Sequence, residues 1–243
     1  MTPNQLLLHL SIINDGNYDK MINALQNKNY PVNDDELKTT TESYVTLMDE
    51  EYPSLLKNTG CKAPIVLYYK GNTELLNNKK VALGYSRKSQ DFNLAILNNL
   101  LKEDEGLTYV VGGSLRNDFI ERLTQTKRVI LVLPCGIENY YQDIVDNVIN
   151  NGGLVISEYP KGVAISQEHF IAKDRIIAGL CDKLLVLSCS KRGGTNILVA
   201  MALQENKDIF VIPTDITSDL NNNDLIYEGA TIVVANHLID DMI

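Results

Sequence analysis

Small and basic residues follow several apolar runs of the sequence, and their types suit the binding of phosphate. The segment GYSRK (84–88) stands between an apolar run and a pattern of helical period. Glycine permits a tight turn there, and the start of the next helix offers unpaired N–H groups to an anion. Arg87 can hold a phosphate through two hydrogen bonds, and Lys88 adds positive charge. The segment predicts a phosphate contact, with a solvated turn as the simpler interpretation.

Two glycine pairs repeat this pattern further along the chain. VVGGS (110–114) follows the next apolar run, and RGGTN (192–196) precedes a helical pattern near the C-terminal end. Paired glycines allow a ligand to approach the backbone closely. They equally allow a tight turn or a close helix–sheet contact without any ligand.

The segment HFIAKDRIIAGL (169–180) predicts a helix with both apolar and basic positions. Its apolar residues would pack on a sheet, while Lys173 and Arg175 would point toward solvent or a crevice. Asp174 stands between them and weakens the local positive field. A solvated helix start is therefore a serious alternative to a binding site.

No catalytic set is recognisable. The histidines (His9, His169, His237) are scattered, and no second ligand stands at metal-binding spacing. There is neither a nucleophile elbow of the type GxSxG nor a Walker A sequence. Ser157 and Glu158 are adjacent at a strand end, where neighbouring side chains point apart. We predict no catalytic residue, no metal and no cofactor, and a protein that is not an enzyme.

Short apolar runs alternate with segments of helical period from about residue 62 onward. The expected strands are 64–69, 81–85, 108–113, 129–134, 154–158, 184–188, 209–213 and 231–234. The expected helices are 90–103, 115–125, 138–150, 168–180, 195–206 and 221–228. Strands that are apolar on both faces and alternate with helices indicate a parallel sheet covered on both sides. We predict an α/β fold with an extended Rossmann-like, doubly wound and mostly parallel sheet.

The predicted organisation has two parts: a helical N-terminal segment (1–47) and a Rossmann-like domain (48–243). Ligands of such sheets bind in the crevice outside the carboxyl ends of the strands. The small, polar and aromatic residues of this chain gather at those ends. Tyr85, Tyr140, Tyr141, Tyr159 and Phe170 are expected near the crevice, where bases can stack on such rings.

Composition narrows the class of protein. A net charge of −9 disfavours a general polyanion binder, although the acids concentrate in residues 33–51 and 205–243 and leave basic stretches elsewhere. No run approaches the roughly 18 apolar residues of a membrane span, and the N-terminus lacks the features of a signal peptide. The four cysteines form no CxxC pair, which suits buried thiols in a reducing cytosol. We expect a cytoplasmic protein without a membrane partner.

Several segments together resemble the DprA/Smf DNA-processing family, in family order and at nearly family spacing. They are EEYPSLL (50–56), APIVLYYKGNTELL (63–76), VALGYSRK (81–88), LPCGIENYY (133–141), GGLVISEYPKG (152–162), FIAKDRIIAGL (170–180), RGGTNILVAMAL (192–203) and DLIYEGATIVV (224–234). The resemblance covers about residues 50–236. It implies a Rossmann-like protein that binds single-stranded DNA, helps to load RecA during natural transformation, and self-associates as a dimer.

The resemblance also implies roles for single residues. Arg87 matches the family's DNA-contacting arginine, and Lys173 and Arg175 match the two arginines of its Phe-x-x-Arg-Asn-Arg motif. With the residues of the strand-end loops, the expected DNA- or phosphate-binding set is Gly84, Ser86, Arg87, Lys88, Gly112, Gly113, Ser114, Arg116, Gly136, Ser157, Lys173, Arg175, Gly193, Gly194 and Thr195.

The chain departs from the family in three places. The family's Gly-Ile-Asp-x-x-Ala-His pattern is replaced by SLRNDFIERL (114–123), Asp174 replaces an Asn, and Asp143 stands where basic residues are common. Two other functions therefore stay open: a small-nucleotide sensor of the same superfamily, and a degenerate member acting through protein interactions. A nucleotide hydrolase is disfavoured, because RGGTNILVAMAL lacks the Glu of the related phosphoribohydrolase motif.

Overall fold

The computed structural model describes residues 2–30, 34–60, 62–102, 106–126 and 128–233. In these ranges nine strands form one sheet, in the order β1-β2-β6-β5-β4-β3-β7-β8-β9. Neighbouring strands from β6 to β9 run parallel, whereas β1 and β2 are antiparallel to their neighbours. The predicted doubly wound α/β architecture is confirmed. Among the described residues, no helix has the length and apolar composition needed to cross a bilayer.

All described strands except β1 occupy the predicted runs, with small shifts at their ends. They are β1 (Ser43–Thr46), β2 (Val66–Gly71), β3 (Lys80–Gly84), β4 (Thr108–Gly112), β5 (Val129–Val132), β6 (Leu154–Ser157), β7 (Lys183–Val186), β8 (Asp208–Val211) and β9 (Thr231–Ile232). The α-helices are α1 (Pro3–Ile13), α2 (Tyr18–Gln26), α3 (Ser54–Lys57), α4 (Gln90–Leu100), α5 (Asp118–Thr124), α6 (Gln142–Asn150), α7 (Gln167–Leu180), α8 (Gly194–Gln204) and α9 (Asn222–Tyr227). Short 3-10 turns cover Asp34–Glu36, Thr73–Asn77, Arg87–Ser89 and Ile137–Asn139.

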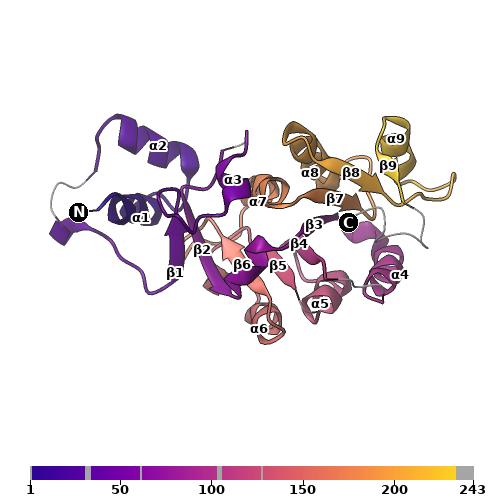
Figure 1. The fold of residues 1–243 in the computed structure, drawn as a ribbon, viewed down its shortest axis with the longest axis horizontal. Helices are drawn as coiled ribbons and strands as arrows, with labels where there is room; N and C mark the ends of the chain where they lie inside the picture. The colour runs from indigo at the N-terminus through magenta and orange to yellow at the C-terminus, as the bar shows by residue number, and fades with distance from the viewer. Residues whose placement is uncertain (1, 31–33, 61, 103–105, 127, 234–243) are drawn as a thin grey trace.

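The two faces of the sheet carry separate cores, because successive side chains of a strand point to opposite faces. Leu83 and Val111 pack with Phe119 in the core under α4, α5 and α6. Ala82 and Val110 pack with Ile177 in the core under α7 and α8. Figure 1 shows the two sets of helices on opposite sides of the sheet. This double coverage explains why the middle positions of the central strands are apolar on both faces.

The strand order reverses at β3. The chain adds β4, β5 and β6 on one side of β3, and α7 then carries it back to β7 on the other side. The loops that follow β3 and β7 therefore diverge at their carboxyl ends. A crevice at this kind of switch point is the usual ligand site of open parallel sheets.

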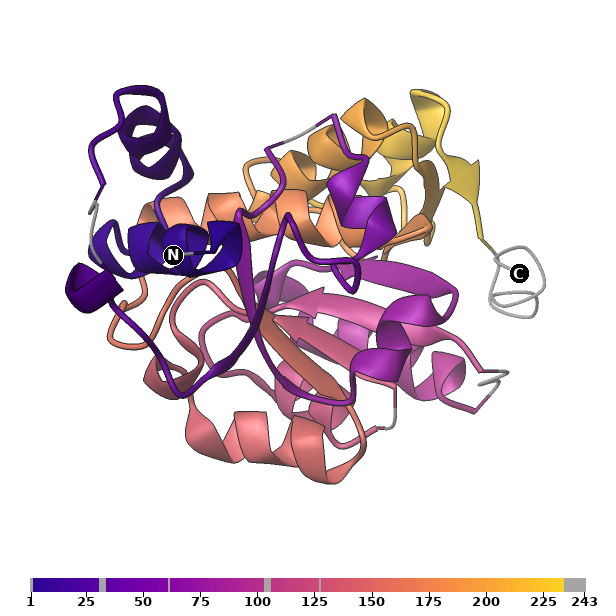
Figure 2. The same cartoon turned by 60° about the vertical axis from the view of Figure 1, so that its left-hand side comes forward.

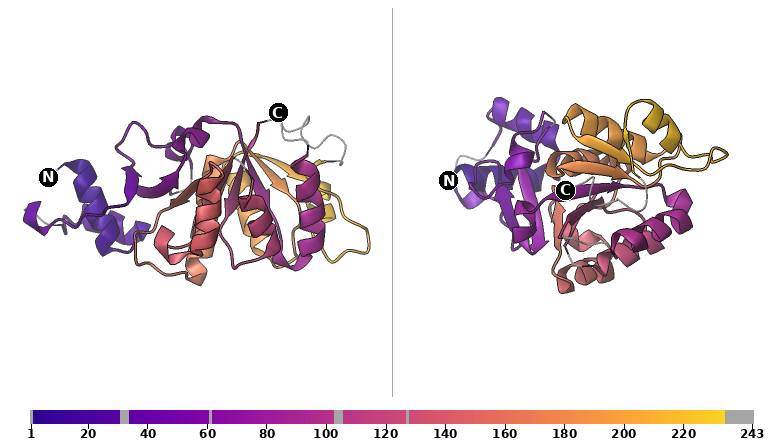
Figure 3. Two further views of the ribbon diagram at one scale, coloured as in Figure 1. Left: turned by 90° about the horizontal axis from the view of Figure 1, so that it is seen from below. Right: turned by 45° about the vertical axis from the view of Figure 1, so that its right-hand side comes forward.

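The N-terminal segment packs against the antiparallel end of the sheet, as Figures 1 and 3 show. Leu10 of α1 is fully buried, and the Tyr68 hydroxyl of β2 donates to the Ser11 Oγ at 3.0 Å. Figure 2 shows α1 and α2 at the opposite end of the molecule from β9. Residues Ser43–Thr46, which we expected in the helical segment, instead form the edge strand β1. Their sequence SYVT has the aromatic and β-branched residues that favour a pleated surface.

Candidate functional site

A pocket of about 1250 Å³ opens at the switch point between β3 and β7. Its walls come from the loops after β3, β4, β7 and β8 and from one side of α7 and α8. The residues of the predicted set that line it are Gly84, Ser86, Arg87, Lys88, Gly112, Ser114, Lys173, Gly193, Gly194 and Thr195. The structure therefore brings ten of the predicted residues to one cavity.

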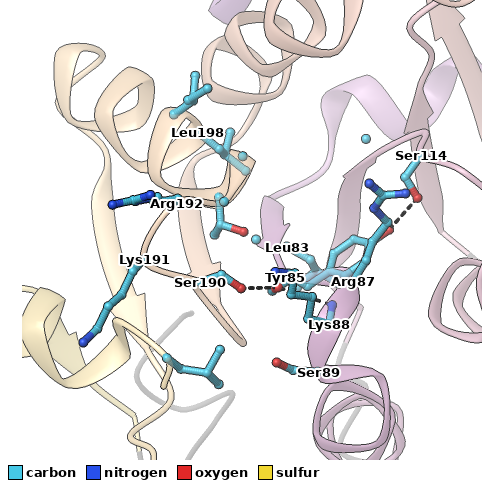
Figure 4. A pocket seen from close by; sticks show the side chains of 18 of the residues that line it. Leu83, Tyr85, Arg87, Lys88, Ser89, Ser114, Ser190, Lys191, Arg192 and Leu198 are labelled. Atoms are coloured by element: carbon cyan, nitrogen blue, oxygen red, sulfur yellow. Dashed lines mark hydrogen bonds between the residues drawn. The ribbon is translucent and has the colours of Figure 1, made fainter. Parts of the chain in front are cut away.

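Four exposed cations stand on two sides of this pocket. Arg87 and Lys88 follow β3, whereas Lys191 and Arg192 follow β7 on the opposite side (Figure 4). Within the described part of the chain, none of the four takes part in an ion pair. Free guanidinium and ammonium groups on both sides of a hollow attract a polyanion.

Buried polar groups hold the loop after β3 in place. The Ser86 N–H donates to the Ser188 Oγ at 2.8 Å, and that hydroxyl donates to the Asn93 Oδ1 at 2.6 Å. The Asn93 amide then donates back to the Ser86 carbonyl at 2.8 Å. The Ser86 hydroxyl also contacts that of Ser190, which joins the two loops at the base of the pocket. Because every bond in this closed network is buried or nearly so, the start of the Arg87–Ser89 turn is preorganised.

Lys173 and Asp174 form a buried ion pair in the pocket wall. The Lys173 Nζ lies 2.6 Å from the Asp174 Oδ1, and both residues are more than nine-tenths buried. A Cβ atom on Gly112 would lie 2.5 Å from that Nζ, so the absence of a side chain there makes room for the lysine. Burial raises the pKa of Asp174, although the charge of Lys173 opposes this effect. The positive charge of Lys173 is thus largely cancelled inside the pocket.

Arg175 lies outside the pocket, and the prediction that it points toward solvent or the crevice is wrong. Its guanidinium holds both carboxylate oxygens of Glu158, with Nη1 2.6 Å from Oε1. It also donates to the carbonyls of Lys62 and Ala172, each at 2.7 Å. The pattern Lys-Asp-Arg placed both cations at the start of one helix, but residues two apart on a helix face different directions.

Arg116 also lies away from the pocket, on the exposed surface over α5 and α6. It forms ion pairs with Glu121 at 2.8 Å and Asp143 at 2.5 Å, and its guanidinium stacks over the Tyr141 ring. The carboxylates of Glu121 and Asp143 already compete for its charge. Arg116 is consequently a weaker candidate for a phosphate contact than the cations after β3 and β7.

Three more predicted residues are buried in packing contacts beyond the pocket. A Cβ on Gly113 would lie 2.9 Å from the Leu133 side chain, and one on Gly136 would lie 2.5 Å from the Pro160 carbonyl. Ser157 is fully buried and donates its hydroxyl to the Cys135 carbonyl. Gly136 follows β5 and Ser157 is the last residue of β6, and both strands lie beyond β4, away from β7. Their predicted place in the same crevice is therefore wrong.

Some of the predicted aromatic residues line the pocket and others do not. Tyr85 and Phe170 line the pocket, together with Phe92 of α4, which the sequence did not single out. The Tyr85 ring packs on Phe119 with 4.1 Å between centroids, and its hydroxyl lies 3.1 Å from that of Ser114. Tyr140, Tyr141 and Tyr159 are not among the residues of the pocket wall. Half-buried rings beside free cations offer stacking surfaces for bases.

The sequence also left Lys191 and Arg192 out of the predicted site. Both lie within four residues after the apolar run 184–188, so their place at a strand end was visible in the sequence. Of the metal-binding residue types, the described part of the chain holds no group of three that could bind an ion. Cys135, Cys181 and Cys189 are buried free thiols, as predicted, whereas Cys61 and His237 lie outside the described residues.

Comparisons with known proteins identify relatives of this chain. The family model of DNA recombination-mediator protein A matches residues 43–243. The DNA processing protein DprA of Streptococcus pneumoniae is 31% identical over 199 residues, which cover 78% of this chain and 70% of that protein. The DNA processing protein DprA of Bacillus subtilis is 25% identical over 179 residues, which cover 70% of this chain and 60% of that protein. The region of this chain that matches the family model includes every loop that lines the pocket.

Two solved structures share the fold. The X-ray structure of DprA from Streptococcus pneumoniae superposes with a TM-score of 0.74 at 28% identity, covering 92% of this chain and 80% of that one. DNA processing protein A from Helicobacter pylori, a structure concerned with that protein's single-stranded DNA binding mode, gives a TM-score of 0.68 at 24% identity. It covers 83% of this chain and 98% of that one.

Proposed function

Because this chain belongs to the DNA recombination-mediator protein A family, which includes the DprA and Smf proteins, we propose that it binds single-stranded DNA in the pocket between β3 and β7. It is a DNA-processing protein by this membership. The single observation that carries the proposal is the placement of four exposed cations, free of ion pairs within the described residues, on two sides of one hollow. The relative from Helicobacter pylori, which has the same fold, binds single-stranded DNA.

The strand would cross the pocket with its phosphates on the two basic loops. Arg87 and Lys88 would hold the backbone after β3, and Arg192 would hold it after β7. Bases between these contacts would stack on Phe92 or Phe170, which requires no particular sequence. In this proposal Arg175 does not contact DNA. Its ion pair with Glu158 positions α7 instead.

Membership of the family supports further proposals about partners. We propose that the protein forms homodimers, acts in the cytoplasm, and assists the loading of a RecA-type recombinase during DNA uptake. Sedimentation of the purified protein would measure its oligomeric state. The lag of recombinase assembly on coated single-stranded DNA, with and without this protein, would measure loading.

The enzyme alternative lacks a carboxylate where its motif needs one. In the related phosphoribohydrolases a Glu stands three residues after the Thr, and in this chain that position is Leu198, which lines the pocket. An aliphatic side chain cannot act as a general acid or base. We therefore propose that the pocket binds its ligand without hydrolysing it.

Fluorescence anisotropy of a labelled oligo-dT at several salt concentrations tests the proposal. The wild type should bind in a salt-dependent way, and the variant Arg87→Ala/Arg192→Ala should bind between about tenfold and a hundredfold more weakly, since each charge-assisted contact contributes about 1 kcal/mol or more. The slope of log K against log salt should fall by about 0.7 for each lost contact.

The variant Lys20→Ala/Lys57→Ala is the matched control, because it removes the same charge from two exposed lysines outside the pocket. It should lower affinity far less than the pocket variant. Absence of oligo-dT binding at low salt, or an equal loss in both variants, would contradict the proposed site.

A further inference from the structure

The first turn of α8 presents unpaired hydrogen-bond donors to the pocket. Gly193 caps this 11-residue helix and has no side chain to bond its N–H groups. The Asn196 N–H bonds the Gly193 carbonyl, but for the N–H groups of Gly194 and Thr195 the described structure holds no partner. A Cβ on Gly194 would meet nothing within 4 Å, so open space adjoins these donors. Helix starts of this kind attract anions.

Thr195 gives independent support for a ligand at this point. The residue lines the pocket and is only 6% exposed, yet its hydroxyl has no hydrogen-bond partner among the described residues. Its methyl group packs on β3, since a Cβ on Gly84 would lie 3.0 Å from the Thr195 Cγ2. The Thr195 hydroxyl is not one of the fully buried unpartnered atoms of the described residues, so it reaches the pocket, where an acceptor atom of a ligand would bond it.

The turn before α8 is rigid and carries free charge. The Asn196 side-chain amide donates to the carbonyls of Ser190 at 2.8 Å and Gly193 at 3.3 Å, and the Gly193 N–H donates to Ser190 at 2.9 Å. These bonds hold Lys191 and Arg192 beside the helix start with no ion pair in the described part of the chain. Three donors, the N–H groups of Gly194 and Thr195 and the Thr195 hydroxyl, thus lie at the helix start, and Lys191 and Arg192 belong to the turn that precedes it.

The wall beyond this point does not suit a second phosphate. Asp215 and Asp219 line the pocket from the loop after β8, which is joined to the turn by the bridge between Ser190 and Leu220. On the other side, Ile197 is an apolar residue of the α8 wall. A nucleotide chain arriving from the Arg87 side would meet carboxylates or aliphatic carbon if it continued past α8.

We propose that the start of α8 is a subsite for a phosphomonoester, which in the proposed DNA-binding function is the terminal phosphate of a strand. A phosphomonoester carries a charge of about −1.5 to −2 at pH 7, against −1 for an internal phosphodiester, and presents three free oxygens. The three donors at the helix start suit these oxygens, and Lys191 and Arg192 of the preceding turn add positive charge near them. A free nucleoside monophosphate has the same chemistry and is the second possible source of the ligand.

Three labelled oligo-dT molecules of one length test the proposal, with a 5′-phosphate, a 3′-phosphate, or hydroxyls at both ends. The wild type should bind one phosphorylated form about tenfold more tightly, which corresponds to about 1.4 kcal/mol. Thr195→Val, which keeps the methyl contact with Gly84, should reduce this preference, and Thr195→Ser should retain it. Arg192→Gln, at an exposed position, should abolish the preference without affecting the fold.

Competition by dTMP and AMP, and the Tm of the protein with each, distinguish the two sources. The subsite belongs to a free nucleotide if two results are found together. The nucleotides raise the Tm of the wild type but not that of Thr195→Val, and the three oligo-dT molecules bind equally well whatever their end groups. If oligo-dT binds but neither end phosphates nor monophosphates have an effect, the inference is overturned and the proposed DNA binding stands. If monophosphates bind and oligo-dT does not, the phosphomonoester subsite stands and the proposed DNA binding is overturned.

Discussion

The Nζ of Lys173 lies 2.6 Å from the Oδ1 of Asp174, and the two residues are adjacent on α7. From the resemblance to the family we expected Lys173 to match the first arginine of the Phe-x-x-Arg-Asn-Arg motif and Asp174 to replace its Asn. The structure therefore places a carboxylate in direct contact with a cation that would otherwise add to the field of the pocket. This pair lowers the net positive charge that the pocket presents to a ligand.

Asp174→Asn should tighten DNA binding. The amide keeps a hydrogen-bond acceptor but removes the charge that neutralises Lys173, so we expect about a fivefold to tenfold gain in affinity and a salt slope steeper by about 0.7. Because burial already disfavours the ionised carboxylate of Asp174, its replacement by a neutral amide should not lower stability. Anisotropy with oligo-dT and a thermal melt measure both effects. Asp146→Asn, on the far helix α6, is the control; an affinity of Asp174→Asn no tighter than that of this control would contradict the prediction.

DNA binding should strengthen as the pH falls toward the raised pKa of Asp174. Burial raises this pKa above its ordinary value of 3.8, so the carboxylate takes up a proton at higher pH in the folded protein than in the unfolded chain. As the pH rises above 3.8, ionisation of Asp174 makes the folded state less stable, because ionising the buried carboxylate costs more free energy than ionising it in the unfolded chain. Protonation also frees Lys173 of its counter-charge.

The measurement is oligo-dT affinity and Tm from neutral pH down to the start of acid unfolding. The wild type should show an affinity that rises on acidification, and Asp174→Asn should give a flatter profile. Parallel profiles for the two proteins would assign the pH dependence to another group.

Arg175→Ala should destabilise the protein without weakening DNA binding directly. It leaves Glu158, which is 4% exposed, as an unpaired buried charge, and losses of about 3–5 kcal/mol are typical in such cases. A chain of this size should lose roughly 10 °C in Tm. Arg87→Ala should do the opposite, because Arg87 is exposed and has no ion pair in the described residues: Tm unchanged, affinity reduced. An affinity loss for folded Arg175→Ala as large as that for Arg87→Ala would restore Arg175 to the binding surface.

The sheet was predictable from sequence because its parallel strands are buried on both faces and so appear as unbroken apolar runs. β1 was not, since Ser43–Thr46 is a short edge strand with polar residues at both ends, and its one buried residue is Thr46. A run of four residues in that pattern gives little periodic signal.

The sequence predicted that a site would lie at the carboxyl ends of the strands, but not which residues would line it. The sequence shows which residues follow strands, and all strands of a parallel sheet end at the same edge. It does not show the order of the strands, which depends on the crossover after β6. That order brings Ser86 beside Ser190 and moves Ser157 away from both. The ion pair of Arg175 with Glu158 was hidden for the same reason, since it joins α7 to the end of β6.

Gly16→Ala should loosen the attachment of α1 and α2 to the sheet. Gly16 has a φ of +71°, and a Cβ there would lie 2.5 Å from the Glu158 carbonyl oxygen, which is backbone and cannot move aside. Gly152→Ala is a matched control, because Gly152 has a φ of +79° and a Cβ there would meet nothing within 4 Å, so that it bears the conformational cost of about 1–2 kcal/mol alone. We expect Gly16→Ala to lose about 2 kcal/mol more than the control. In hydrogen exchange, amides of α1 and α2 should exchange faster while those of α5 and α8 do not. Equal stability losses in the two variants, or faster exchange throughout the sheet, would show that the N-terminal segment is not attached through this contact.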